Sequence, residues 1–232
     1  MGQRSDFLLF FSFLLICGAS CSFLYGQPCS DRNTAYLDTT RWSLPKNQTN
    51  CVDITGTTSI SSIPQEDEFY SPVRDADTLY ADHMNLHKFP IFLIYRLSRL
   101  ELVDLSDNHI RRVPHKLHKI APSLTRLLLP DNAIVVSSKR SLFKSDSVKL
   151  LMLSRNFIKN IYPITFSKLP NLEILYLDGN YIKHFTSNVF RSLSRLLYLN
   201  LENNVLEEVP PKEMLSSELR IYIVNNQKKV IK

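Results

Sequence analysis

Glycine is scarce in this chain, with five residues among 232. Glycine-rich turns bind phosphates and dinucleotides because the backbone must approach these ligands closely, and the sequence contains no such turn. It also contains no nucleophile elbow and no kinase signature. His115 and His118 have a spacing that metal ligands can adopt, but no cysteine or carboxylate follows at a suitable interval. We therefore expect no enzymatic activity, no cofactor and no metal site.

Long hydrophobic segments are also scarce. The densest apolar run, residues 7–16, follows Arg4 and precedes the small residues 18–20. This order is typical of a secretory signal peptide, and the run is shorter than the roughly 20 residues that a membrane-spanning helix needs. Residues 1–20 are thus predicted to be a signal peptide, and the mature protein to be secreted and extracellular. The alternative is a membrane anchor formed by an uncleaved N-terminal segment.

Cysteine is rarer still than glycine, with four residues. Cys17 lies in the predicted signal peptide and Cys21 directly follows it, which leaves Cys29 and Cys51. These two are expected to form a disulfide in an oxidising compartment, and closing a loop of this size contributes roughly 3 kcal/mol to stability. Asn47 lies within the loop and begins the only N-glycosylation motif of the sequence, so we expect it to carry a glycan.

What the sequence does contain is a repeat of 24 residues. In the clearest unit, residues 100–110, apolar side chains occupy positions 1, 4, 6 and 11, and an asparagine occupies position 9. Four more units follow without insertion, and less regular units lie at both ends. Repetition at a fixed period indicates a solenoid, in which each coil buries its apolar face against its neighbours. We expect about seven coils over residues 76–232, the last of them incomplete.

The positions of the repeat have different structural roles. Positions 4 and 6 alternate with other residues at the period of a strand that has one face against a core, so each unit should add one strand to a parallel sheet. The asparagine lies where the chain leaves the strand, and its amide can pair with backbone groups of adjacent coils that would otherwise be buried unpaired. We expect these residues to form a ladder: Asn108, Asn132, Asn156, Asn180 and Asn204.

The units resemble the typical 24-residue class of the extracellular leucine-rich-repeat family. Cys51 and the following Ile60-Ser-Ser-Ile63-Pro64 are similar to the N-terminal cap of that family. The resemblance implies an α/β solenoid, a leucine-rich-repeat horseshoe with a parallel concave β-sheet and an irregular or short-helical convex side. It assigns residues 21–75 to the cap and 76–232 to the repeats. The concave sheet or one flank of such a horseshoe binds protein, glycan or lipid ligands.

Two features depart from the family pattern. Its N-terminal caps usually carry four cysteines, whereas this chain has two or three after removal of the signal peptide. A cysteine-bearing C-terminal cap is missing. The last coil would then face water, a second copy of the chain in a homodimer, or further sequence beyond Lys232.

The concave surface is predicted from positions 3, 5 and 7 of each unit, which point away from the core. A solvated sheet face should be polar, but apolar and aromatic residues dominate its middle. Large exposed apolar patches mark interaction sites, and tyrosine is favoured there. The other interpretation is that side chains crowd one another on a curved face. The predicted contact residues for a protein partner are Leu102, Leu128, Leu150, Met152, Ile174, Tyr176 and Tyr198.

Positive charge marks a second candidate surface. The net charge is +6, and basic residues gather on the convex loops of the first clear repeats. Arg111, Arg112, Lys116 and Lys119 could bind sulfated glycans or an acidic protein. Nucleic acid is not expected, because stacking aromatics are not interleaved with these charges.

These observations favour a secreted recognition module that binds a protein ligand or receptor through its concave face. The family resemblance suggests innate immunity or cell-surface and matrix signalling as settings. One alternative is a matrix protein that binds sulfated glycans through the basic convex loops. Another is an enzyme inhibitor that blocks an active site with the concave face.

Overall fold

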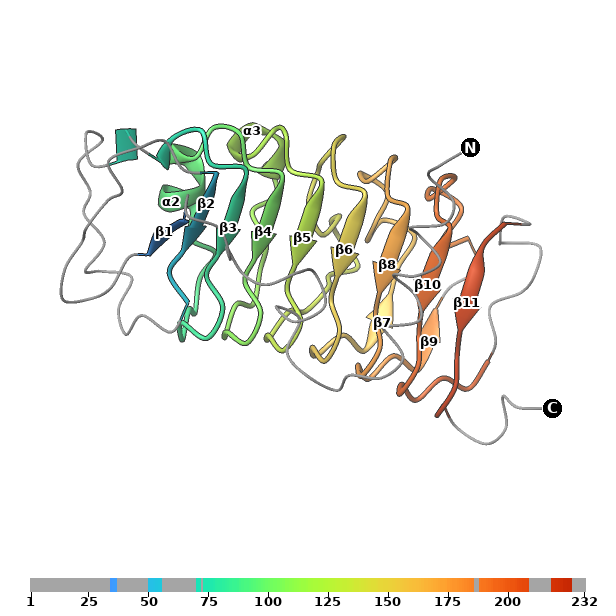
Figure 1. Cartoon of the computed structure of the whole chain (residues 1–232). Coiled ribbons are helices and arrows are strands. Elements are labelled where there is room, and N and C mark those ends of the chain that lie inside the picture. Colours follow the sequence, from blue (N-terminus) through green and yellow to red (C-terminus); the bar gives the residue numbers. More distant parts are fainter. Residues whose placement is uncertain are drawn as a thin grey trace, which may run out of the picture.

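The computed structural model describes residues 34–36, 50–55, 70–71, 73–185, 188–208 and 218–226, with the backbone alone at 34–36 and 185. In this part of the chain the coils stand side by side, and each adds one short strand to a parallel sheet (Figure 1). The strands are paired in chain order, so the predicted parallel solenoid is confirmed. The sheet contains β1 (Thr34–Tyr36), β2 (Cys51–Asp53), β3 (Thr78–Tyr80), β4 (Leu102–Asp104), β5 (Arg126–Leu128), β6 (Leu150–Met152), β8 (Ile174–Tyr176), β10 (Tyr198–Asn200) and β11 (Arg220–Tyr222).

The register of the sheet follows the 24-residue repeat. Val103 at the centre of β4 pairs with Leu127 of β5, and Leu127 pairs with Leu151 of β6. These position-4 side chains are fully buried in the core. Because successive side chains of a strand point to opposite faces, positions 3 and 5 lie on the other side of the sheet. This second side is the predicted concave face.

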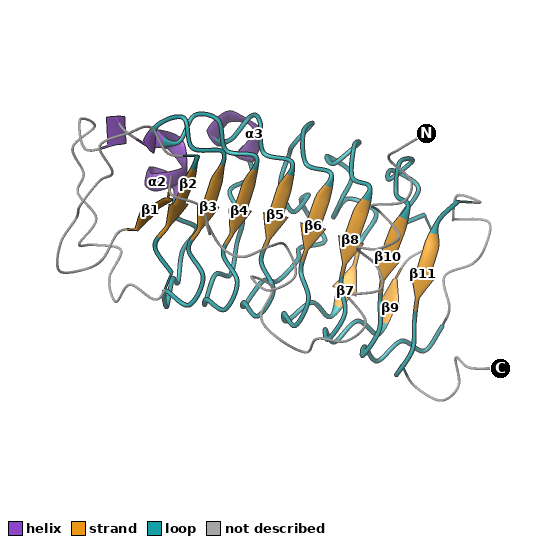
Figure 2. Ribbon diagram, in the orientation of Figure 1, coloured by secondary structure: helices purple, strands orange, loops and turns teal. Residues whose placement is uncertain are grey.

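The convex side is built from irregular chain, two short helices and a small second sheet (Figure 2). Helices α2 (Ile91–Arg96) and α3 (Leu117–Ile120) belong to the N-terminal coils. In later coils β7 (Asn160–Ile161) pairs with β9 (His184–Phe185). The predicted mixture of irregular and short-helical structure is therefore present. Neither helix has the length or the continuous apolar character needed to cross a bilayer, and the rest of the described chain holds no other candidate.

One apolar core fills the space between the sheet and the convex side. Position 14 of the repeat supplies Val113 and Ile161 to this region, and both side chains are buried. The unit between them has Ser137 at the same position, and its chain turns outward there, with an antiparallel bridge between Ser137 and Arg140. A serine in place of a larger apolar side chain leaves the convex surface hollowed at this unit.

From β3 onward, the turn after each strand of the large sheet places a residue in the left-handed region at position 8. His83, Asp107, Asp131 and Arg155 have φ values of 50° to 55° there, and Gly179 has a φ of 65°. The left-handed residue reverses the chain direction directly before the asparagine of position 9. This turn therefore brings each asparagine side chain into the interior of the stack.

Candidate binding surfaces of the repeat array

The five predicted asparagines lie in one row of buried side chains along these turns. The amide of Asn156 donates to the backbone carbonyl of Leu129 in the preceding coil at 2.8 Å and to two carbonyls of its own turn. Its side-chain oxygen accepts from the backbone N–H of Ile134 at 2.8 Å. Asn226 repeats the pattern in the last described coil. The ladder thus satisfies buried backbone groups of adjacent coils, which is a structural role.

The concave face carries a second hydrophobic cluster, separate from the core. We call it the concave cluster. Six of the seven predicted contact residues belong to it, and the seventh, Leu102, is buried outside it. The concave cluster consists of buried Leu128, Leu150, Met152, Tyr176 and Tyr198, with partly buried Ile174 and Tyr222 packed against them.

The expectation that these side chains are exposed is wrong. The five central members have exposed fractions of 0–7%. Equivalent positions on neighbouring strands lie opposite one another at a spacing of about 4.8 Å, and large apolar side chains at that spacing pack laterally. Only Ile174 and Tyr222 are partly accessible. The face is therefore a packed apolar layer, and its part in partner binding stays a prediction.

Tyrosines form the C-terminal end of the concave cluster. The rings of Tyr176 and Tyr198 have centroids 5.0 Å apart, and those of Tyr198 and Tyr222 are 5.1 Å apart. Burial raises the pKa of Tyr198 to about 12. Tyr222 was not among the contact residues predicted from the sequence, although the last repeat fits the pattern when its spacing is shortened to 22 residues. The register of β10 and β11 places Tyr222 opposite Asn200, at position 5.

The N-terminal end of the same face is acidic. Asp104 on β4 is fully buried, and its Oδ1 accepts hydrogen bonds from the backbone N–H of Ser106 at 2.9 Å and from the Ser106 hydroxyl. Its Oδ2 has no hydrogen-bond partner. Burial, reinforced by the negative charge of Asp82, raises the pKa of Asp104 from 3.8 to about 6 against the effect of the Ser106 bonds. Sequence analysis assigned Asp104 no role, because a single aspartate in a strand carries no motif.

The neighbouring carboxylates of Asp82 and Asp107 are joined by His83. The Nδ1 of His83 lies 2.8 Å from Asp82 Oδ2, and its Nε2 lies 2.8 Å from Asp107 Oδ2. Asp82 also accepts a hydrogen bond of 2.6 Å from the Thr55 hydroxyl. The hydrogen bond to Asp82 raises the pKa of His83, with burial opposing it. Within the described ranges, no three His, Cys, Asp or Glu side chains are grouped as metal ligands would be.

The predicted basic residues lie exposed on the convex loops, and their part in binding a polyanion stays a prediction. Arg111 and Arg112 line a shared hollow of about 420 Å³, whereas Lys116 and Lys119 lie at α3 and line neither of the two hollows found here. The other residues around this first hollow are Ala133, Val135 and Phe157.

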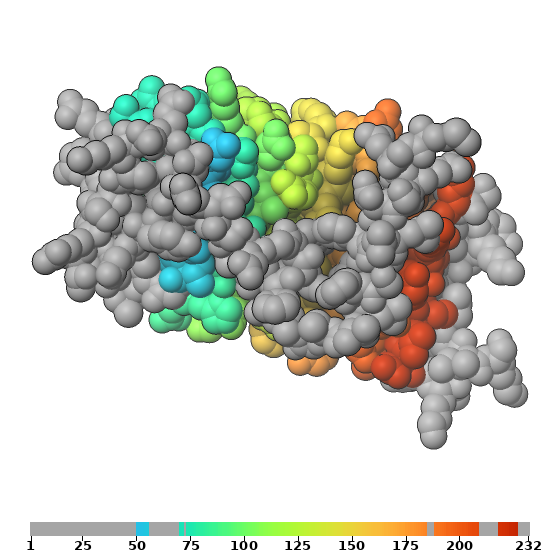
Figure 3. Space-filling view, in the orientation of Figure 1, coloured from blue at the N-terminus to red at the C-terminus, as the bar shows by residue number. Residues whose placement is uncertain are grey.

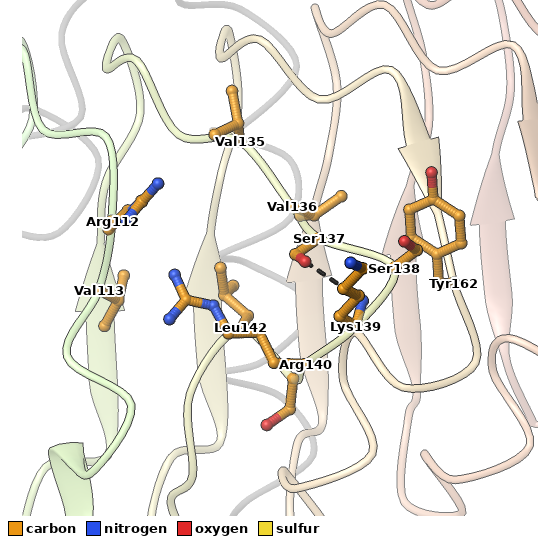
Figure 4. Close-up of a pocket in the computed structure, with 11 residues that line it drawn as sticks. Arg112, Val113, Val135, Val136, Ser137, Ser138, Lys139, Arg140, Leu142 and Tyr162 are labelled. Atoms are coloured by element: carbon orange, nitrogen blue, oxygen red, sulfur yellow. Dashed lines mark hydrogen bonds between the residues drawn. The ribbon is translucent and has the colours of Figure 1, made fainter.

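A larger hollow of about 600 Å³ lies at the unit that carries Ser137, and we call it the basic pocket. In Figure 4 its loop, residues 135–142, runs between Arg112 on the preceding coil and Tyr162 on the following one. Lys139 and Arg140 add two further positive charges, and no carboxylate lines the basic pocket. Sequence analysis missed these two residues. The serine at an apolar position of the repeat is the signal that could have revealed the hollow.

Several predictions concern residues outside the described ranges. The signal peptide, Cys29 and the glycan site Asn47 all lie there, as does the end of the chain at which a homodimer contact was expected. Cys51 is disulfide-bonded, but its pairing with Cys29 stays a prediction. The predicted cap and repeat boundaries also stay predictions.

Comparisons with known proteins find similar repeats and a similar fold. The leucine-rich-repeat family model matches residues 122–182 and 170–227. The fold is similar to that of a leucine-rich-repeat protein of Leptospira interrogans, with a TM-score of 0.57 and 20% sequence identity. That match covers 89% of this chain and 58% of the other. No curated protein matches the chain. With this repeat, this sheet register and these matches, the chain has the fold of a leucine-rich-repeat solenoid, and residues 122–227 match the repeats of that family.

Proposed function

We propose that this chain is a secreted, non-enzymatic recognition module that binds a protein ligand or receptor through the concave face of its sheet. Leucine-rich repeats commonly serve as protein-binding modules and rarely as enzymes. The observation that carries the proposal is the concave cluster. Its side chains lie on the side of the sheet that does not close the solenoid, so coil stacking does not require them to be apolar.

The composition of the concave cluster suits a protein partner. Tyrosine presents a large apolar ring and a polar hydroxyl, and it is favoured among the residues that dominate interface energies. Partly accessible Ile174 and Tyr222 give a partner its first contact, and the buried rings of Tyr176 and Tyr198 pack behind Tyr222 and hold it in place. The predicted signal peptide and the extracellular family resemblance support a setting in innate immunity or in cell-surface and matrix signalling.

The test compares concave and non-concave aromatics in one binding assay. The full chain, expressed for secretion, serves as immobilised bait in extracellular fluid, together with a Tyr176→Ala, Tyr198→Ala double variant. Tyr181→Ala is the matched control, because Tyr181 is half exposed and stacks with Phe157 away from the concave cluster.

We expect a protein captured by the wild type and by the control to be lost from the double variant, with affinity reduced at least tenfold, as for interface hot spots. The melting temperature of each variant confirms that it is folded. Equal capture by the folded double variant would contradict the proposal.

The basic pocket favours a second candidate function, the binding of a sulfated glycan. Three cationic side chains, from Arg112, Lys139 and Arg140, line it together with the Ser137 and Ser138 residues and without an acidic neighbour. These cations make no ion pair within the described ranges. Such a site matches the charge and hydrogen-bonding groups of a sulfated sugar.

Heparin chromatography tests this candidate. We expect Arg112→Glu with Arg140→Glu to elute at clearly lower salt than the wild type, because two attractive contacts become repulsive. Lys116→Glu with Lys119→Glu changes the charge equally outside the basic pocket. An equal shift from both pairs would indicate that net charge alone governs retention.

A further inference from the structure

Among the described residues, Asp104 is the one acidic side chain with a buried oxygen that lacks a hydrogen-bond partner. Its exposed fraction is 0%, and both donors from Ser106 go to Oδ1. Oδ2 is buried without a hydrogen-bond partner. A buried carboxylate oxygen without a donor is costly, and native proteins rarely keep one without a functional reason.

The groups around Asp104 do not supply the missing donor. On the β3 coil, the carboxylate of Asp82 accepts from the Thr55 hydroxyl and contacts Nδ1 of His83. The second ring nitrogen of His83, Nε2, contacts Asp107. Tyr80 lies opposite Asp104 on β3. On β5, Leu128 lies opposite Asp104, and Arg126 precedes it at position 3. No cationic nitrogen of the described residues lies within ion-pair distance of Asp104.

The position of Asp104 in the sheet defines the chemistry that would satisfy it. Its β5 neighbour, Leu128, is the first member of the concave cluster, which continues from there to Met152 and Tyr176. One carboxylate oxygen at the edge of an apolar layer therefore lacks a donor, and because it is buried, a ligand cation reaches it only when the side chains that cover it move aside. A lysine or arginine side chain with apolar neighbours matches this arrangement in charge and in polarity.

We propose that Asp104 is the anchor of the concave face for a lysine or arginine side chain of the protein partner, whose adjacent apolar residues pack on the concave cluster. This inference rests on the proposed function. It adds a specificity-determining residue and states the chemistry of the segment that binds. Asp178 lies on the same face but differs from Asp104: it is only partly buried, and neither of its carboxylate oxygens is buried without a hydrogen-bond partner.

Protonation of Asp104 gives this anchor a pH dependence. Burial places the pKa of Asp104 near 6, so the carboxylate is ionised at pH 7.4 and largely neutral at pH 5. A cation binds the ionised form, so affinity is highest above pH 6 and falls as the pH decreases below it. The hydrogen bond to Asp82 raises the pKa of His83, which favours its protonated form, and the positive charge of that form weakens cation binding in the same direction.

The experiment uses a random dodecapeptide library displayed on phage, selected at pH 7.4 against the full secreted chain. The same selection is run on Asp104→Asn, which keeps the side-chain shape, and on Asp178→Asn as the matched control. A Tyr176→Ala, Tyr198→Ala variant reports on the concave face itself. Enriched peptides are then synthesised, and their dissociation constants are measured with each variant at pH 7.4 and pH 5.

We expect wild type and Asp178→Asn to enrich peptides with a lysine or arginine beside apolar residues. Asp104→Asn should keep the apolar preference, lose the basic one, and bind the wild-type peptides at least about tenfold more weakly at pH 7.4, the size of effect that a charged hydrogen bond has. At pH 5 the wild type should fall toward the affinity of Asp104→Asn, whose own affinity varies less with pH.

Two results separate failure of the anchor from failure of the proposed function. If the enriched peptides bind through the tyrosines but show no basic preference, or if Asp104→Asn keeps that preference, the anchor is overturned and concave binding stands. If no peptide is enriched over a phage control, or if the tyrosine variant binds as well as the wild type, concave binding is overturned and the anchor with it.

Discussion

The two sides of the one sheet follow different rules. On the core side, positions 4 and 6 carry apolar residues in the described coils. Val103, Leu127 and Leu151 are fully buried, and only the last coil, with Ile221 and Ile223, is partly buried there. On the concave side, equivalent positions change along the array, from Asp104 through Leu128 to Tyr176. Stacking of the coils therefore requires apolar residues on the core side. It sets no such requirement on the concave side, where the residue type varies from coil to coil.

This difference separates fold from recognition. A coil can be added or removed without altering the pattern of the core side, because each repeat contacts only its neighbours. The concave side has a direction, from an acidic N-terminal end to an aromatic C-terminal end. A directional surface can fix the orientation of a bound partner, which a uniform surface cannot do.

The largest expected effect compares adjacent residues of β6 that point to opposite sides. Leu151→Ala should reduce the free energy of unfolding by about 2–5 kcal/mol, because it opens a cavity in the core. Leu150→Ala removes the same atoms from the concave cluster and should cost about 1–2 kcal/mol, because that layer is smaller and can rearrange. Urea unfolding measures both. Equal losses would mean that the concave cluster is as essential to the fold as the core.

The core side was predictable from the sequence because every coil needs apolar side chains at the same positions of the repeat. An interval of 24 residues placed Leu151 in the core and Asn156 in the ladder, and a single unit would have been ambiguous. The last repeat is two residues shorter than the others, and the concave positions were not extended into it, so Tyr222 was not predicted. The concave residues were also placed on the correct side, because a strand alternates strictly.

Burial and hydrogen bonding on the concave side were not predictable in the same way. The sequence analysis expected exposed side chains, but lateral packing depends on the size of residues 24 positions apart. The free oxygen of Asp104 depends on where Ser106 directs its two donors. The basic pocket depends on a loop conformation at Ser137 that the repeat does not specify.

The next largest loss of stability is expected in the turn that follows each strand, where the asparagine ladder lies. Asn156→Ala should reduce the free energy of unfolding by roughly 1–3 kcal/mol, because it leaves buried backbone groups of two coils without partners. Asn200→Ala is the control, since Asn200 lies on the concave side and bonds within its own coil, to Glu202. Its loss should be under about 1 kcal/mol. An unchanged urea midpoint for Asn156→Ala would show that the ladder is dispensable.

The smallest expected change in the free energy of unfolding is a gain in stability, and it comes from a substitution at the acidic end of the concave face. Asp104 has a pKa of about 6 when folded, against an ordinary value of 3.8, so the folded state binds protons more tightly than the unfolded state. Stability therefore falls as the pH rises from about 4 to about 6, and the ionised carboxylate costs on the order of 3 kcal/mol at pH 7. Asparagine at this position removes that cost but adds buried N–H groups that lack acceptors.

Asp104→Asn should therefore stabilise the protein by about 1 kcal/mol at pH 7, where burial of the charge is the larger penalty. Below pH 4 the wild-type carboxyl is neutral, and the variant should become the less stable of the two. Chemical unfolding of both proteins between pH 4 and pH 7.5 measures the crossing. Burial raises the pKa of Asp178 as well, against the hydrogen bond from Ser154, but Asp178 is only partly buried, so Asp178→Asn should show a smaller effect of the same sign. Parallel pH profiles for wild type and Asp104→Asn would mean that Asp104 is solvated or paired when folded, and the concave face would then lack its one unsatisfied charge.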